Sequence, residues 1–243
     1  MKNFSFVLFV LFLLCPVCVT LGKTLPDQFN NKDVRGWIIL SDDMNAAIQT
    51  IKAAKEYDIN QLQLSHEIIH DLREIKTEKV CAQVNELVNL AHSEEINEVL
   101  LWDHSLYDID YYPERFRTGP GGTIDLDNTE FWEWLKDDYR QMLDRVSEAD
   151  GLVLTFIETG AYAERQFSKK MKSSEEKLAA VVNAISDVLI GERKKKLYIR
   201  TFAYSEEEYK GTTGCIEYLK YDEVILMMKE TPHDFFLTHP DNY

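Results

Sequence analysis

The sequence is poor in positive charge and lacks the short motifs that mark nucleotide chemistry. It holds 27 Lys and Arg residues against 42 Asp and Glu residues, which gives a formal net charge of -15. Phosphates of nucleic acids and anionic lipids attract Lys and Arg, so this balance argues against DNA, RNA or an anionic membrane as partner. No GxGxxG loop follows the first expected strand, and neither a P-loop nor a GxSxG nucleophile elbow occurs. We therefore expect no nucleotide cofactor.

Cysteine is scarce as well. Cys15 and Cys18 lie in the N-terminal hydrophobic segment, which leaves Cys81 and Cys215 far apart in the remaining chain. That remaining chain has no CxxC pair and no Cys/His spacing typical of a zinc site, so we expect no metal and no cofactor. Although an exported protein could form a disulfide, we expect two separate buried thiols.

The one long hydrophobic run stands at the N-terminus, at Phe4–Leu14. It is too short for a comfortable membrane span and suits the core of a signal peptide. Cleavage after Gly22 leaves residues 23–243 as the mature domain. We therefore expect an exported protein, periplasmic or extracellular, that meets a membrane only through this segment. A lipoprotein anchor is less favoured, because Cys15 and Cys18 lack the small residue that usually precedes a lipid-modified cysteine.

Short hydrophobic runs alternate with amphipathic segments along the rest of the chain. The clearest run is GLVLTFIETG, Gly151–Gly160, whose β-prone residues between glycines are typical of a buried parallel strand. We expect strands at 36–40, 59–64, 98–102, 153–157, 196–202 and 223–228. We expect helices at 45–55, 71–92, 131–143 and 175–190, and a short acidic helix after Ser205.

This alternation indicates parallel strands joined by right-handed crossovers. An open doubly wound sheet and a (β/α)8 barrel both fit it. Polar residues at most strand ends and a long aromatic loop at 105–128 favour an α/β fold of the TIM-barrel type. A closed barrel of this type has eight strands, so we expect an incomplete barrel of about six βα units. Missing units would expose strand edges, so we expect this chain alone to be poorly stable or inactive.

Carboxylates follow several of the expected strands. In barrels of this type, catalytic residues usually lie at the carboxyl ends of the strands. Glycoside hydrolysis needs two carboxylates across a cleft, one to protonate the leaving oxygen and one to activate water or attack carbon. The alternative is structural, with each carboxylate paired to a neighbouring cation. Similarly, the aromatic residues from Tyr107 to Phe116 either stack on sugar rings or pack over the barrel. The carboxylates are Asp103, Glu158, Glu230 and, close behind, Asp234.

Three successive segments resemble the catalytic barrel of the family 67 α-glucuronidases, enzymes that release glucuronic acid from xylan-derived oligosaccharides. The first, Asp127–Met142, has an aromatic-rich helix that leads into the strand ending at Glu158. The second, LYIRTFAY at Leu197–Tyr204, is similar to the family's Val-Arg-Thr-Phe-Val-Tyr strand. The third, MMKETPHDFFLTHP at Met227–Pro240, has the family's Lys, Pro and Asp-Phe. The resemblance therefore covers about residues 127–240.

The resemblance implies a role for each matching residue. Glu158 would be the general acid that protonates the glycosidic oxygen, and Asp234 the general base that acts on water. Arg200 and Lys229 would bind the carboxylate of the sugar. The other residues that we expect to bind substrate, from their places at strand ends, are Trp102, Asp103, His104 and Glu230.

We therefore expect an exported, α-glucuronidase-like glycoside hydrolase that acts on oligosaccharides derived from polysaccharide. The chain departs from the family at Leu154, where the family has Lys, and at Glu230, where it has Asn. Two alternatives stay open. One is a non-catalytic carbohydrate-binding or inactive truncated relative, and the other is a complete six-stranded open sheet with a structural or interaction role.

Overall fold

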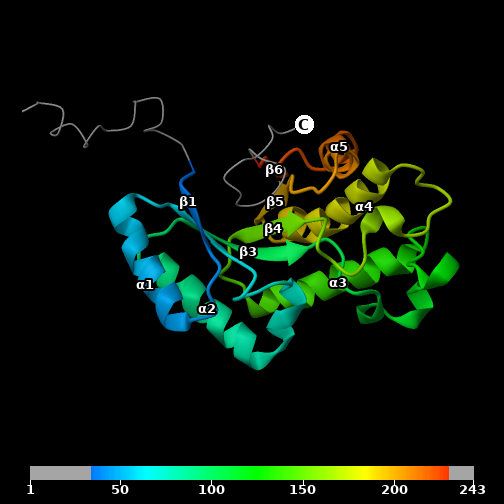
Figure 1. The fold of residues 1–243 in the computed structure, drawn as a ribbon. Helices are drawn as coiled ribbons and strands as arrows, with labels where there is room; N and C mark the ends of the chain where they lie inside the picture. Colours follow the sequence, from blue (N-terminus) through cyan, green and yellow to red (C-terminus); the bar gives the residue numbers. More distant parts are fainter. Residues whose placement is uncertain (1–33, 230–243) are drawn as a thin grey trace, which may run out of the picture. The chain divides into compact units, whose positions relative to one another are not determined.

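The structure is a computed structural model that describes residues 34–229. In this range six strands form one sheet in which all neighbours are parallel, and their spatial order is their order in the sequence (Figure 1). The strands are β1 (Gly36–Ile39), β2 (Gln61–Leu64), β3 (Glu98–His104), β4 (Gly151–Thr155), β5 (Lys196–Arg200) and β6 (Ile225–Met227).

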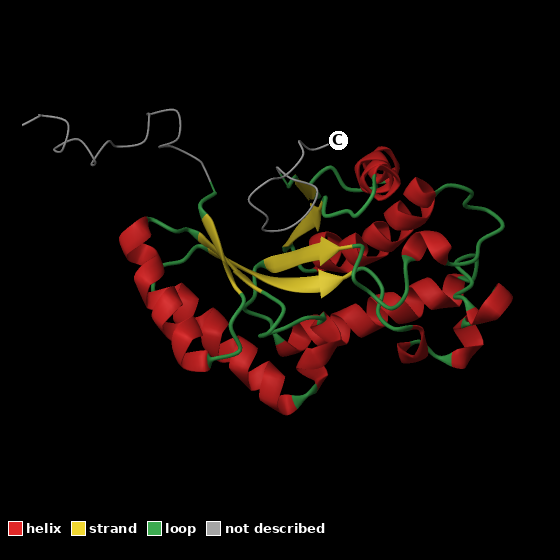
Figure 2. Ribbon diagram, in the orientation of Figure 1, coloured by secondary structure: helices red, strands yellow, loops and turns green. Residues whose placement is uncertain are grey.

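The sequential strand order distinguishes the two architectures that the sequence allowed. A doubly wound sheet reverses its order at a switch point, whereas a barrel places each new strand beside the previous one. Figure 2 shows the strands as one twisted sheet with the helices packed around the outside of it. The predicted α/β fold with about six βα units is confirmed, and the curled half-barrel sheet is compatible with an incomplete TIM-like barrel.

The helices begin at polar caps that the sequence makes easy to recognise. Asn128, Ser173 and Ser205 each accept a hydrogen bond from a backbone N–H of the first turn of the helix that follows. Ser173 also forms a reciprocal capping box with Glu176. The helices are α1 (Met44–Ala54), α2 (Glu78–Ser93), α3 (Thr129–Arg145), α4 (Ser174–Ser186) and α5 (Glu206–Gly214).

One predicted helix, at 71–92, is wrong in its first part. The structure has a short 3-10 helix at Leu72–Lys76, an extended Thr77, and only then α2. The backbone N–H of Leu72 is turned to the carboxylate of Asp103, at 2.9 Å, instead of joining a longer helix. This break leaves His70 and Asp71 outside regular helix, close to the end of β3.

The two faces of the sheet have different surroundings. Alternate strand residues such as Leu64, Leu101 and Leu154 belong to the main hydrophobic core that includes the helices. The opposite face holds a smaller apolar cluster made of strand residues alone: Leu100, Trp102, Val153 and Tyr198. In a barrel, such a layer of inward side chains fills the interior, so the second face corresponds to the inside of the half-barrel.

The inner face also carries polar side chains below its apolar layer. Gln61 donates to Glu98 at 2.7 Å, and the hydroxyl of Tyr198 donates to the same carboxylate at 2.7 Å. Each of these buried polar groups therefore has a partner, as buried polar groups require. This network lies toward the amino end of the sheet, and in barrels of this type the site is found at the opposite, carboxyl edge.

Cys81 and Cys215 are separate free thiols, as expected from the sequence, but only Cys215 is buried, whereas Cys81 is partly exposed. Burial raises the pKa of the Cys215 thiol to about 12, so this group is an inert core residue. Among residues 34–229, no helix has both the length and the apolar character that a bilayer crossing demands.

Candidate functional site

The candidate site lies at the carboxyl edge of the sheet, which we call the mouth. Successive strands and the loops that leave them supply its side chains, so neighbours in the sheet become neighbours at the mouth. Residues at the ends of β3 and β5, and in the segments that follow β2, β4, β5 and β6, meet there although they are far apart in the sequence. They are His66, Trp102, His104, Glu158, Arg200, Tyr204 and Lys229.

Three histidines and one tryptophan form a contiguous layer at the mouth. The ring of His66 lies 4.8 Å from that of Trp102 and 5.4 Å from that of His70. The ring of His70 is stacked on His104, with centroids 4.4 Å apart. Burial lowers the pKa of His66, and the nearby charges of His70, His104 and Arg200 lower it further, against the opposing effect of Glu158. The layer thus favours a neutral His66 at the centre of the mouth.

Asp71 anchors the histidine layer. Its carboxylate is hydrogen-bonded to Nδ1 of His104 at 2.7 Å and accepts from the guanidinium of Arg73 at 2.9 Å. Burial acts to raise the pKa of Asp71, but the hydrogen bond with His104 and the charges of His104, Arg73 and His70 outweigh it and lower that pKa. Asp71 is therefore a buried anion within the mouth, and it fixes the ring of His104.

Glu158 stands where β4 has ended and the chain turns away from the sheet. Its backbone has a φ of 60°, a left-handed conformation that is uncommon for a residue with a side chain. The hydroxyl of Tyr204, from the loop after β5, donates a hydrogen bond to its carboxylate. Asp58, His66, Glu95 and Lys194 also have a positive φ, so this conformation marks a tight turn, and a role for Glu158 depends on its position and its contacts.

A small cavity of about 140 Å³ opens beside Glu158. Asp71, Glu74, Asp108 and Glu158 bring four carboxyl groups to its wall, together with the cation Arg73. Asp108 is paired with Arg73 at 2.8 Å, so part of this negative charge is neutralised. Glu158 and His70 both line this cavity, so a ligand bound in it would lie beside Glu158 and the histidine layer.

Two cations lie on the other side of the mouth, around one aromatic ring. The guanidinium of Arg200 is 4.7 Å from the ring centre of Trp102 and 5.0 Å from that of Phe202. The ammonium of Lys229 is 4.2 Å from the same Phe202 ring. These cation–π contacts hold two positive charges near each other, which is an arrangement suited to an anionic ligand group.

The structure gives Asp103 a different place from the one that we expected. Although it belongs to the last part of β3, its side chain points to the helix side and is fully buried. Its carboxylate accepts from the hydroxyl groups of Tyr107 and Tyr139, at 2.9 and 2.6 Å, as well as from Leu72. Burial raises the pKa of Asp103 to about 7 despite these donors. Asp103 therefore joins loops to helices and does not face the mouth.

The aromatic loop at 105–128 is packing, which was one of the two alternatives from the sequence. Tyr107, Tyr112 and Phe116 are buried, and rings of this loop contact Phe131 and Trp134 of α3 edge to face. The loop therefore covers the outer side of the half-barrel, where it cannot act as an exposed platform for sugar rings.

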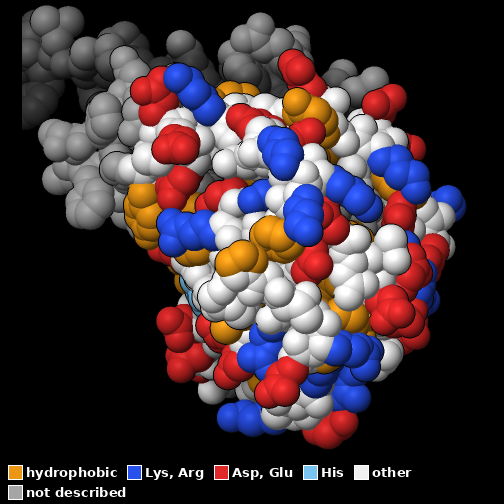
Figure 3. Space-filling model, turned by 90° about the vertical axis from the view of Figure 1, so that its right-hand side faces the viewer, with side chains coloured by type: hydrophobic (Ala, Val, Ile, Leu, Met, Phe, Trp, Pro, Cys, Tyr) orange, Lys and Arg blue, Asp and Glu red, His pale blue; other side chains and the backbone are white. Residues whose placement is uncertain are grey.

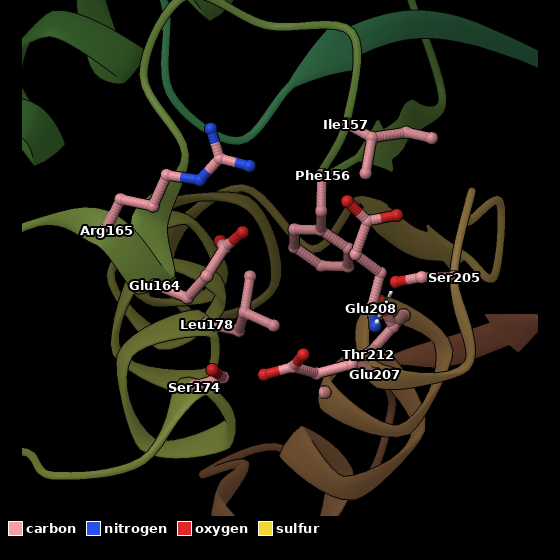
Figure 4. A pocket seen from close by; sticks show the side chains of 11 residues that line it. Phe156, Ile157, Glu164, Arg165, Ser174, Leu178, Ser205, Glu207, Glu208 and Thr212 are labelled. Atoms are coloured by element: carbon pink, nitrogen blue, oxygen red, sulfur yellow. Dashed lines mark hydrogen bonds between the residues drawn. The ribbon is translucent and has the colours of Figure 1, made fainter.

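A larger cavity, of about 480 Å³, lies next to the mouth between the loop after β4 and the N-terminal ends of α4 and α5. Figure 4 shows the carboxylates of Glu164, Glu207 and Glu208 around it, with the guanidinium of Arg165 on one side. Burial raises the pKa of Glu164. Ile157 and Ser205 line this cavity, and they are the chain neighbours of Glu158 and Tyr204. The cavity therefore adjoins the hydrogen-bonded pair of Glu158 and Tyr204.

Among the described residues, the face drawn in Figure 3 shows no concentration of one type of side chain that would indicate a binding site. Figure 3 shows acidic and basic side chains interspersed on one face of the described chain, together with small groups of hydrophobic side chains. This mixed face is typical of an ordinary solvated surface. The candidate site is therefore defined by the mouth and its two cavities.

Sequence reasoning identified some members of the site and missed others. Trp102, His104, Glu158, Arg200 and Lys229 lie together as expected from strand ends, whereas Glu230 and Asp234 lie outside the described residues. His66, His70, Asp71 and Tyr204 were missed as site residues. The position of His66 just after β2 was a usable signal, but the expected helix at 71–92 hid Asp71.

Comparison with protein families and with curated proteins finds no match. Solved structures do match, and one of them is CpGH84B, a glycoside hydrolase. The TM-score is 0.53 and the sequence identity 13%, over 82% of this chain and 33% of the CpGH84B chain. The chain thus spans about a third of that structure's length. At this identity the likeness shows similarity of fold alone, and membership of family 67 stays a prediction.

Proposed function

We propose that this chain is a glycoside hydrolase domain that cleaves glycosidic bonds in polysaccharide-derived oligosaccharides, with Glu158 as the general acid. The observation that carries the proposal is the placement of Glu158. It stands in the loop just after the central strand β4, accepts a hydrogen bond from Tyr204, lines the small cavity, and follows Ile157, which lines the larger one. A general acid must be fixed within reach of the leaving oxygen, and the hydrogen bond from Tyr204 supports such a role for Glu158.

The substrate side of the proposal rests on the two cations. Arg200 and Lys229, both in contact with the ring of Phe202, would bind the carboxylate of a uronic acid by charge-assisted hydrogen bonds. This supports an α-glucuronidase-like specificity, with Trp102 and His104 as the floor beneath the sugar. The proposal has three further parts. Asp234 would be the general base, and Glu230 would be a further binding residue. The protein would be exported by a signal peptide at residues 1–22.

The test is hydrolysis of a panel of aryl glycosides and xylan-derived oligosaccharides, including glucuronides, by the protein and by Glu158→Gln. General acid catalysis contributes about 10²- to 10⁴-fold, so we expect kcat to fall by at least about 10²-fold in the variant. Glu86→Gln changes an exposed carboxylate on α2 and serves as the matched control. Equal activity of Glu158→Gln and the protein would reject this role for Glu158.

A non-catalytic carbohydrate-binding role is the second candidate. It is favoured by one observation: two of the other carboxylates of the small cavity, Asp71 and Asp108, are engaged with Arg73, and the third, Glu74, accepts from the backbone N–H of His70. Titration of the protein with glucuronic acid and with xylo-oligosaccharides separates the two. Binding that survives in Glu158→Gln, with no hydrolysis by either protein, would support the binding role.

A further inference from the structure

His70, Asp71 and His104 bring three metal-ligating groups to one point beside the mouth. Their ligand atoms all lie within 4.8 Å of one another. Nδ1 of His70 is 3.4 Å from Oδ1 of Asp71, and Nδ1 of His104 is 2.7 Å from the same oxygen. Ligands about 2.0–2.2 Å from a shared zinc ion lie at comparable separations from one another, so only small movements would be needed.

A second observation concerns the ring of His104. Its side chain is 1% exposed, and its Nε2 has no hydrogen-bond partner among residues 34–229. Nδ1 is the nitrogen that faces Asp71, so Nδ1 is the ligand atom that His104 offers to the cluster, and Nε2 lies on the opposite side of the ring. The contact between Nδ1 and Asp71 already holds these two ligand groups side by side in the fold.

We propose that His70, Asp71 and His104 bind a divalent first-row transition-metal ion such as Zn²⁺. Two imidazoles and one carboxylate are a donor set that suits zinc and its neighbours, whereas Mg²⁺ and Ca²⁺ prefer oxygen ligands. Three protein ligands leave at least one position open. His70 and Asp71 line the cavity of about 140 Å³ that Glu158 also lines, so this position faces the same space as Glu158.

Sequence spacing did not predict this site, because its ligands come from two segments 33 residues apart. The break before α2 supplies His70 and Asp71, and the extension of β3 beyond Trp102 supplies His104. The proposal does not depend on hydrolysis, since metal affinity is measured without any sugar.

The first experiment is calorimetric titration of the chelator-treated protein with Zn²⁺. We expect about one ion to bind, and His70→Ala to weaken its affinity by at least about tenfold, because even supporting residues of metal sites have effects of this size. His70 is partly exposed, so its removal should leave the fold intact, as far-UV circular dichroism would verify. His92→Ala is the matched control, since His92 pairs with Asp150 at 2.9 Å elsewhere in the molecule.

The second experiment uses the unaltered protein and Co²⁺. We expect visible absorption bands of a four- or five-coordinate ion, which Zn²⁺ abolishes by displacement. No stoichiometric binding of either ion would overturn the proposal. So would equal Zn²⁺ affinities of the protein and His70→Ala, or equal losses in His70→Ala and His92→Ala.

Discussion

The hydroxyl of Tyr204 donates a hydrogen bond to the carboxylate of Glu158, which joins the loops that follow β5 and β4 at the mouth. The two residues are 46 positions apart, and only the parallel pairing of their strands brings them together. This contact links the fold to the proposed chemistry, since it fixes the exposed carboxylate of Glu158 in the loop that follows β4.

Removal of the Tyr204 hydroxyl should lower catalysis more than binding. A hydrogen bond to a charged group is worth about 1.5–3 kcal/mol, so Tyr204→Phe is expected to lower kcat by about tenfold or more. KM and the thermal midpoint should change little, because the hydroxyl only positions Glu158. Tyr218→Phe, at an exposed tyrosine of another loop, is the control. A variant that alters KM alone would show that Tyr204 binds substrate and does not position the acid.

Lys229 should discriminate between charged and neutral sugars. If its ammonium binds a uronic carboxylate beside Phe202, Lys229→Met is expected to raise KM for a glucuronide by about tenfold or more. KM for an uncharged glycoside should stay the same. Lys210→Met, which removes an exposed cation from α5, should change neither value. A parallel loss on both substrates would argue that Lys229 has only a structural role.

Asp103 should make the protein less stable as the pH rises from about 4 to about 7. The pKa of an unfolded aspartate is about 3.9, whereas burial raises that of Asp103 to about 7. Between these values the folded state holds a proton that the unfolded state has lost. The free energy of unfolding therefore decreases with pH across this interval.

Asp103→Asn should remove this component while it keeps the hydrogen bonds. An amide oxygen still accepts from Leu72 and Tyr107, and the hydroxyl of Tyr139 can accept from the amide nitrogen. The difference in unfolding free energy between the two proteins should then change by a few kcal/mol, at about 1.4 kcal/mol per pKa unit. Urea unfolding in chelator-treated buffer across this pH range measures it, and a constant difference would contradict the prediction.

A glycine at position 151 should be required for stability, because β4 lies very close to β5 at this position. A Cβ at this position would meet the backbone carbonyl of Lys196, which cannot move without disturbing the strand pair. We expect Gly151→Ala to destabilise the protein by about 1–3 kcal/mol in urea unfolding. At Gly36 the nearest atom to such a Cβ is the flexible end of Gln61, so Gly36→Ala should cost less. Equal losses of unfolding free energy in the two variants would show that the close approach of β4 to β5 is not the reason for the cost at Gly151.

The sequence allowed the sheet to be predicted because strands and helices have different periods. The runs that contain Leu101, Leu152 and Ile199 are short and continuous, as parallel strands buried on both faces require. Boundaries were less accurate, since tertiary contacts decide them. The pairing of β3 with β4 carries the strand on to His104, beyond the end expected at Trp102.

The site was harder to predict than the sheet, for a physical reason. Arg200 is the last residue of β5 and Glu158 lies shortly after the end of β4, so their positions could be inferred from strand ends. Asp71 reaches His104 only because the chain leaves helical geometry before α2, and that break depends on the carboxylate of Asp103. A sequence pattern does not contain such contacts between distant segments. Nor does it show that the side chain of Asp103 points to the helices.

The central claim is that Glu158 protonates the leaving group, and the most direct measurement is the leaving-group dependence of Glu158→Gln. A good leaving group such as dinitrophenol needs no protonation, whereas a sugar alkoxide does. We predict a loss of at least about 10²-fold on oligosaccharides and a small loss on the dinitrophenyl glycoside. An equal loss on both substrates, or no loss on either, would contradict the account.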